Sequence, residues 1–548
     1  MWYKIKALIK HLNSSEKKVF YFFIILLLIS GSSLSFIVFN KLTKTVPIFG
    51  GKYTEGIIGQ PVFINPVIAG NNDADRDLIS LLFCNAYDIA ETLESEDSQS
   101  WQIRLKDNVL WHDGEKLTSD DIIFTLQKIQ DPEFRSPSGT TWQGVSIERV
   151  SEREIKINLS TPYAFFEENL KRLFIIPKHI FADIPLNNWR LSDYNLQPIG
   201  CGPYKFDSYK KKTDGFITKY ILKANQEYFD TPPYIENFEI NFYTDPQKAV
   251  EDFNFARLDG LGNLSKSQYN LVSRTNQIFQ LPTPRYYAVF MNQNTHPALK
   301  DKNVRLALDS AVNKMDIINK VFGGWAEPVN GPITPNFLEN SIEIQNSDAL
   351  NAKDILENSG WKLKDSEVRE KVISKEKVSL QFDFIVPEID FLIDTAHYLQ
   401  KSWEEIGVKT NIIILTPEEI NNEIIKDRNY QLLIFGNILG ANPDTFSFWH
   451  SSQKLHPGLN LSLYSSKSAD KLIETIRKET NPEERMGELS SLQSLIIKDI
   501  PAIFLYSPYY IYATTKDLSG FENKLIVTPT SRFDDLENWF VKTARELK

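Results

Sequence analysis

An uninterrupted apolar run near the amino terminus constrains this chain more than any other feature. The run covers 21 residues, Val19 to Phe39, and contains no charged side chain. As a helix it spans about 30 Å, which matches the hydrocarbon thickness of a membrane. Five lysines and a single acid, Glu16, precede it, and this charge pattern favours a cytoplasmic start. We therefore predict a basic cytoplasmic segment at 1–18, a transmembrane anchor at 19–39 and a linker at 40–52.

Cleavage of the run as a signal peptide is the alternative. A cleaved signal usually has a shorter apolar region, followed by a site with small residues. The small residues here, Ser30 to Ser35, lie inside the run, and no cysteine directly follows it that could carry a lipid. We therefore expect the anchor to be retained in the cell membrane, with the large domain on the outer face.

The composition fits a large folded protein that is not a nucleic-acid binder. The chain has 548 residues, of which 42% are hydrophobic and 24% are charged, enough for more than one domain. Its net charge of −10 argues against nucleic acid as a partner, because phosphate binding needs a basic face. For Cys84 and Cys201 we expect two buried thiols, with one disulfide as the alternative in an exported protein.

The sequence offers no pattern that points to catalysis or to a metal. Of the seven histidines only His450 and His456 are close together, and their spacing matches no helical metal pair. No serine lies in a nucleophile-elbow motif, and neither cysteine has a base beside it in the sequence. We expect no catalytic residue, no metal site and no cofactor, and therefore no enzyme.

Alternating strand and helix patterns predict an α/β protein. The clearest series consists of strands at 378–386, 408–415 and 431–435 with helices at 391–407 and 418–428. An earlier helix is predicted at 77–93 from the spacing of its leucines and isoleucines.

One stretch in the middle of the chain combines a strand with a helical pattern. The aromatic run Tyr286 to Met291 predicts a buried strand, and the apolar spacing that follows predicts a helix capped by Asp301. Asn313, with Asp316 three residues on, suits the cap of a second, shorter helix, and Gly323 suits its end.

Several short motifs follow one another in a fixed order. A tryptophan, a His-Asp-Gly turn and a helix capped by Thr118 occur between Trp101 and Leu126. The others are a Pro-x-Gly-x-Gly-Pro-Tyr turn at Pro198 to Tyr204, an Asn-Pro-Leu-Lys-Asp block at Asn292 to Leu308, a Gln-Trp-Ile-Gly block at Gln400 to Gly407 and Asp499 to Pro501. In this order, from about Thr54 to Val541, the chain resembles the family 5 extracellular solute-binding proteins, which serve oligopeptide, dipeptide and nickel ABC importers.

The resemblance implies a type 2 periplasmic-binding-protein fold, in which two lobes joined by a hinge close on a ligand. Larger members of the family carry an extra small domain in the first lobe. On that pattern the extra domain is 76–189 and lobe II is 286–499, and lobe I combines 51–75, 190–285 and 500–548. The hinge strands would contain Tyr287, Phe290 and Leu505.

The resemblance also implies a ligand loop in lobe II, from Phe435 to Trp449. The candidate ligand-binding residues are Asn437, Leu439, Asn442, Asp444, Phe446 and Trp449. Leu439 stands where peptide binders of the family have an aspartate that holds the peptide's amino group. Either Asp444 substitutes from a shifted position, or the ligand lacks a free amino terminus there. A simple turn cap is the alternative role for Asp444.

These observations predict an anchored, monomeric receptor outside the cytoplasm. It would bind a peptide or another small molecule and deliver it to the permease subunits of an ABC importer by lobe closure. Two alternatives are an anchored extracellular hydrolase of envelope peptides and a ligand sensor or chaperone with the same fold.

Overall fold

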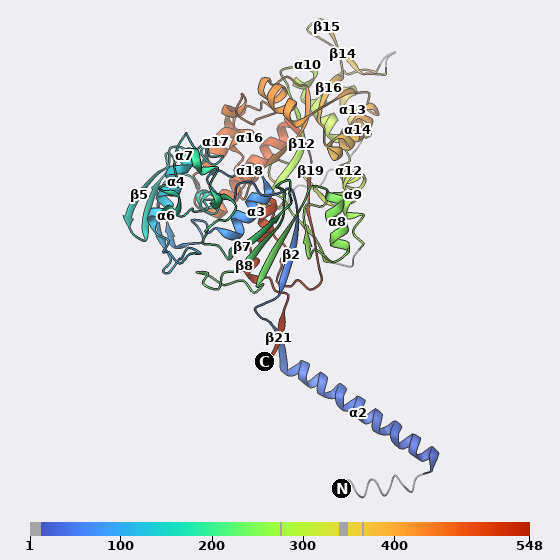
Figure 1. The fold of residues 1–548 in the computed structure, drawn as a ribbon. Helices are drawn as coiled ribbons and strands as arrows, with labels where there is room; N and C mark the ends of the chain where they lie inside the picture. The colour runs from blue at the N-terminus through green and yellow to red at the C-terminus, as the bar shows by residue number, and fades with distance from the viewer. Residues whose placement is uncertain (1–12, 274–276, 339–348, 364–366, 548) are drawn as a thin grey trace.

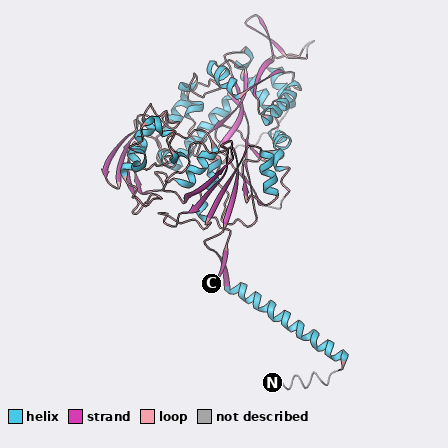
Figure 2. Ribbon diagram, viewed as in Figure 1, coloured by secondary structure: helices cyan, strands magenta, loops and turns pink. Residues whose placement is uncertain are grey.

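The computed structural model describes residues 13–273, 277–338, 349–363 and 367–547 (Figure 1). Outside the described residues lie part of the predicted basic segment, 1–12, and parts of the predicted lobes, 274–276, 339–348, 364–366 and 548. Figure 2 separates the strands of the folded body from the helices that surround them.

A single long helix leaves the folded body at the amino-terminal end (Figure 1). This helix, α2, is Ser14–Leu42; Asn13 and Glu16 form its capping box. It is long and apolar enough to cross a membrane, and none of its side chains is buried in the protein. Directly after it, β1 (Thr43–Pro47) pairs antiparallel with the last strand, β21 (Thr543–Leu547). The first and last strands therefore pair with each other at the carboxyl-terminal end of α2.

The sheet nearer to this helix has seven strands. Its central strand β2 is parallel to both of its neighbours, β9 and β10, while the outer pairs are antiparallel. The order across the sheet is β11 (Gln277–Leu281), β20 (Tyr510–Thr514), β10 (Gly260–Leu261), β2 (Lys52–Ile58), β9 (Asn237–Tyr243), β8 (Ile217–Ala224) and β7 (Tyr204–Lys211). Strands from both ends of the chain thus build one sheet, flanked by α8 (Pro246–Asn254) and α9 (Lys266–Tyr269).

A smaller antiparallel sheet with its own helices lies to one side of the first sheet (Figure 1). Its strands, in order, are β3 (Ala90–Glu94), β4 (Ser100–Leu105), β6 (Glu154–Asn158) and β5 (Ser146–Ser151). The helices around it are α4 (Ser119–Gln130), α5 (Phe166–Leu170), α6 (Lys178–Phe181) and α7 (Leu186–Trp189). The helix α3 (Asp73–Leu82) precedes this sheet in the chain but packs against β7 and the turn at Pro529–Phe533. Thr118 caps α4, as predicted. The predicted end of the helix at 77–93 is wrong. The helix α3 stops at Leu82 because the backbone of Phe83 is extended.

The second large sheet has six strands and lies farther from α2. Its order is β13 (Ala326–Pro328), β19 (Ala502–Pro508), β12 (Arg285–Met291), β18 (Leu432–Ile438), β16 (Gln381–Pro387) and β17 (Lys409–Leu415). Alternate residues of β12 enter separate apolar cores on the two faces of the sheet, Val289 in one and Phe290 in the other. The helices that cover these faces include α13 (Ala349–Asn358), α14 (Asp390–Glu404), α17 (Lys467–Ile476) and α18 (Pro482–Asp499).

Local predictions in this region are confirmed, with one correction. Asp301 caps α11 (Lys302–Ser310), Asn313 caps the shorter α12 (Lys314–Ile317), and Gly323 ends the following turn with a φ of +67°. The strand predicted at 378–386 is instead two strands, β15 (Glu376–Ser379) and β16. The break falls at Leu380, whose N–H donates to the carbonyl of Arg369.

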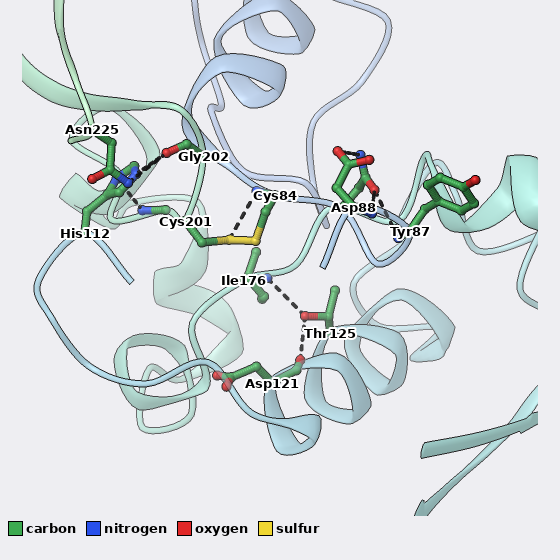
Figure 3. Close-up of a disulfide and its surroundings, with 12 residues drawn as sticks. Cys84, Tyr87, Asp88, His112, Asp121, Thr125, Ile176, Cys201, Gly202 and Asn225 are labelled. Carbon is green, nitrogen blue, oxygen red and sulfur yellow. Dashed lines mark hydrogen bonds between the residues drawn. A yellow bond between two sulfur atoms is a disulfide. The ribbon is translucent and has the colours of Figure 1, made fainter. Parts of the chain in front are cut away.

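Cys84 and Cys201 form a disulfide, so the expectation of two thiols was wrong (Figure 3). Their Cα atoms are 5.2 Å apart, although 117 residues separate them in the chain. The physical reason is the turn at Pro198 to Tyr204. Its two glycines, Gly200 and Gly202, lie so close to the backbone of Leu82 that neither has room for a Cβ. The turn therefore packs directly on the end of α3 and brings the two sulfur atoms together.

Candidate functional site

The chain passes twice between the two large sheets, and the two passages lie side by side. One runs from β11 to β12 and the other from β19 to β20. Thr283 Oγ1 donates to the carbonyl of Pro508 at 2.8 Å, and Ser507 Oγ donates to the carbonyl of Thr283 at 3.1 Å. Both side chains are buried. Two adjacent connections of this kind allow two bodies to rotate about a common hinge.

The expected hinge residues lie just inside the second sheet. Tyr287 and Phe290 are on β12, and Leu505 is on β19. The ring of Tyr287 packs against those of Phe391 and Tyr506, with centroid distances of 5.1 and 5.8 Å. Phe290 and Leu505 are buried in the cores on opposite faces. These side chains hold in place the strands from which the two passages leave.

The loop between β18 and α16 (Phe446–Trp449) is closed at its base by one buried hydroxyl. Tyr286 Oη accepts hydrogen bonds from Asn437 Nδ2 at 2.8 Å and from Trp449 Nε1 at 3.0 Å. All three side chains are buried, and burial raises the pKa of Tyr286 well above its usual value. The polar groups of Asn437 and Trp449 are therefore used to fix the loop on the sheet.

Both carboxylate oxygens of Asp444 are engaged within the protein. Oδ1 accepts the N–H of Phe446 at 3.1 Å, which is the turn-capping arrangement. Oδ2 accepts the hydroxyl of Tyr163 at 3.1 Å and lies 3.2 Å from Nε of Arg477. Burial and then the charge of Asp444 raise the pKa of Tyr163 above its usual range, so its hydroxyl keeps the proton it donates.

Asp444 belongs to a wider contact between the small antiparallel sheet's domain and the second large sheet. We call this contact, formed by Tyr163, Phe165, Asp444, Phe446 and Arg477, the distal contact. The Arg477 guanidinium lies 4.5 Å from the ring centroid of Phe446 and 5.1 Å from that of Tyr163. Phe165 is 7% exposed and packs in a core of the second sheet. The small sheet's domain and the second sheet thus touch at a place separate from the two passages.

The last residue of β18 and the four residues after it, 438–442, are what we call the open part of the loop. Ile438 is 54% exposed and pairs across the strands with Arg285. Leu439 is only 7% exposed, and its N–H donates to the carbonyl of Pro284 at 2.8 Å. Gly440 has a φ of +88°, and a Cβ placed on it would lie 3.3 Å from Nη2 of Arg172. Asn442 Oδ1 accepts the N–H of Asp444 at 3.1 Å.

Sequence reasoning did not point to the partners of this loop. Tyr163 is 281 residues from Asp444, and Arg172 is similarly remote from Gly440. Arg477 comes after α17, well beyond the loop that it contacts. No local pattern marks them, because an isolated arginine or tyrosine resembles any surface residue.

The comparison with protein families decides what kind of protein this is. The model of the bacterial extracellular solute-binding proteins, family 5, matches residues 86–456, well over half of the chain. The chain belongs to this family. Its members are non-catalytic solute-binding proteins, which sets aside the hydrolase alternative.

Named relatives extend over nearly the whole chain. The oligopeptide-binding protein AppA of Bacillus subtilis is 26% identical over 521 residues, which cover 90% of this chain and 92% of AppA. The crystal structure of CtaP from Listeria monocytogenes, an ABC transporter substrate-binding protein, is 26% identical with a TM-score of 0.75, covering 90% of this chain and all of CtaP. NikZ from Campylobacter jejuni, solved with Ni(L-His), is 25% identical with a TM-score of 0.68, covering 89% and 99%. The protein is thus an extracytoplasmic solute-binding protein with the family's mixed α/β fold.

Proposed function

We propose that the protein binds peptides between two lobes and delivers them, as a monomer, to the permease subunits of an ABC importer. The observation that carries this proposal is the pair of adjacent passages at Thr283 and Ser507, about which two sheet-based bodies can close on a ligand. The name of AppA, an oligopeptide-binding protein, favours peptides over the nickel complex that NikZ holds.

On this proposal the lobes follow the two large sheets. Lobe I consists of 51–75, 190–285 and 500–548, with the extra domain at 76–189, and lobe II is 286–499. The ligand would lie between the hinge and the distal contact, next to the loop from Phe435 to Trp449. The open residue of that loop, Ile438, offers apolar surface, whereas Asn437 and Trp449 support it from below.

We further propose that α2 remains as a membrane anchor. The ribbon of β1 and β21 begins immediately after the helix, which ties the folded body to the membrane surface at one point. The intact mass of the protein purified from membranes tests this. A mass that includes 19–39 is expected, and a mass lacking these residues would mean that the helix is a cleaved signal.

A thermal-shift screen tests the peptide assignment. The full-length protein in detergent is heated with mixed peptide pools of defined length, and the same mixtures are analysed afterwards by mass spectrometry. We expect a concentration-dependent rise in Tm with the peptides left intact. No shift with any pool would contradict the assignment. Crosslinking in cells to an importer permease distinguishes delivery from the sensor or chaperone alternative.

A further inference from the structure

The charges around the open part of the loop point to the chemistry of the ligand that lies there. This inference rests on the proposed peptide-binding function. A ligand's ammonium group placed against the loop and removed from water would need a carboxylate beside it, since an unpaired buried charge costs several kcal/mol. The chemistry therefore depends on which charged side chains the loop and its neighbours have available.

The loop has no carboxylate to offer. Asp444 is the only acidic residue between Phe435 and Trp449. Its Oδ1 accepts a backbone N–H, and its Oδ2 is shared between Tyr163 and Arg477. An incoming ammonium would have to displace Arg477, which also stacks on Phe446.

Two arginines flank the open part of the loop. Arg285 lies directly opposite Ile438 in the antiparallel pair, so the two side chains share one face of the sheet. Its Nε is buried and has no hydrogen-bond partner among the residues that the structure describes. Arg172, which follows α5, reaches across from the extra domain to Gly440. Within the described parts of the chain, neither guanidinium has an acidic oxygen within 4.0 Å.

Other charged groups near Arg285 do not neutralise its guanidinium. Asp73, the first residue of α3, is close enough for Arg285 to lower its pKa slightly, but burial and Asp77 raise that pKa more strongly. Asp73 lies 3.9 Å from its own neighbour Arg76. Arg285 also lies against Tyr287, whose pKa burial raises and Arg285 lowers.

We propose that Arg172, Arg285 and Ile438 form a subsite for a ligand end that is anionic, such as a peptide whose terminal amine is replaced by an acidic group. The guanidinium groups supply donors in a planar fork that fits a carboxylate. Ile438 supplies apolar contact beside them. A free ammonium end is disfavoured here because the two guanidinium groups repel it and the one carboxylate of the loop is occupied.

The test uses one mixed-sequence peptide pool in three chemical forms. The amino ends are left free, acetylated or succinylated, so that the end is positive, neutral or negative on the same sequences. The full-length protein in detergent is incubated with an equimolar mixture of the three forms, and bound peptides are quantified by mass spectrometry. We expect the succinylated form to be enriched about tenfold or more over the free form, with the acetylated form between them.

Two substitutions connect the preference to the subsite. Arg172→Gln removes one cation and should reduce the enrichment of succinylated peptides several-fold while leaving acetylated peptides unchanged. Ile438→Asp adds a carboxylate at an exposed position, so it is compatible with folding, and should shift the selection toward free amino ends. Arg104→Gln, a surface change in the extra domain, is the matched control and should leave the selection unaltered.

The outcomes separate this inference from the proposed function. Equal or stronger retention of free-amine peptides by the unmodified protein would overturn the inference while supporting peptide binding. Retention of no form at all would overturn the proposed peptide-binding function itself. An unchanged selection in Arg172→Gln and Ile438→Asp would show that the preference arises at another place in the protein.

Discussion

At the scale of single residues, several side chains are held in one chemical state by their surroundings. His112 is the clearest case (Figure 3). Its Nδ1 accepts the N–H of Gly200 at 3.2 Å, and its Nε2 lies 3.1 Å from the carbonyl of Gly202, to which it can donate. One donor and one acceptor are what a neutral imidazole offers. His112 therefore fastens the glycine turn that also carries Cys201.

This arrangement predicts a pH-dependent stability. Burial lowers the pKa of His112 from 6.5 to about 4, so between these values the unfolded chain binds the proton and the folded protein does not. The contribution of neutral His112 to the free energy of unfolding is complete above about pH 6.5. It declines as the pH falls toward 4, by about 3 kcal/mol in all. Urea unfolding of the wild-type protein and of His112→Gln across this range measures it. Identical pH profiles for the two proteins would contradict the prediction.

Arg532 is a second residue whose surroundings predict a large effect. It lies in a fully buried cluster, 2.9 Å from Glu55 and 2.6 Å from Asp77. Replacing it with methionine leaves two carboxylates without their cation, and we expect a loss of about 3–5 kcal/mol in the free energy of unfolding. The exposed pair of Arg149 and Asp120 provides the control, because Arg149→Met should cost less than about 1 kcal/mol. Similar losses in the two variants would show that Arg532 has no special structural role.

At the scale of elements, contacts between distant segments decide how the parts are joined. The disulfide ties the end of α3 to the turn before β7, and the distal contact ties the extra domain to the loop after β18. Both contacts connect segments that are more than 100 residues apart in the chain.

Removing the disulfide should weaken the first of these connections. For the double variant Cys84→Ala, Cys201→Ala we expect a loss of about 2–4 kcal/mol, since the bridge restricts the unfolded chain. Thiol titration of the denatured, unreduced wild-type protein should find no free thiol. Two titratable thiols would mean that the bridge does not form.

Tyr163→Phe tests the distal contact. The substitution removes the hydroxyl that donates to Asp444 at 3.1 Å but keeps the ring on Arg477. A hydrogen bond to a charged group is worth about 1.5–3 kcal/mol, so the ligand-free protein should populate an open form more, by a factor of about ten or greater. Small-angle scattering would show this as a larger radius of gyration. Tyr209→Phe, in the first sheet, should leave the scattering curve unchanged; an equal change in both variants would refute the role of this contact.

Features that depend on local contacts could be predicted from the sequence, whereas features that depend on distant contacts could not. Asp301, Asn313 and Thr118 could be predicted as helix caps because the partner of each cap lies within three residues. The disulfide and the hydrogen bond from Tyr163 to Asp444 could not, because they depend on close packing between segments more than 100 residues apart. The candidate loop could be located from the resemblance to a family. The contacts of Asp444 with Tyr163 and Arg477 could be seen only in the structure.

At the scale of the whole molecule, two adjacent passages join two sheet-based bodies, and one long apolar helix precedes them. The two passages between the large sheets and the distal contact lie at separate places. On the proposed function, closure encloses a ligand between them. The helix α2 is long and apolar enough to cross a membrane, and the ribbon of β1 and β21 follows it directly, which is the basis of the proposed anchor. On the proposed function, these parts together receive a solute outside the cytoplasm and present it to a permease.

Native mass spectrometry of the full-length protein, purified in detergent from cells grown in a peptide-rich medium, tests the central claim most directly. We predict a bound species of one peptide or a family of peptides per protein, released on denaturation and identified by fragmentation. A protein that carries no peptide and gains none from added pools, or that carries a metal complex instead, would contradict the claim.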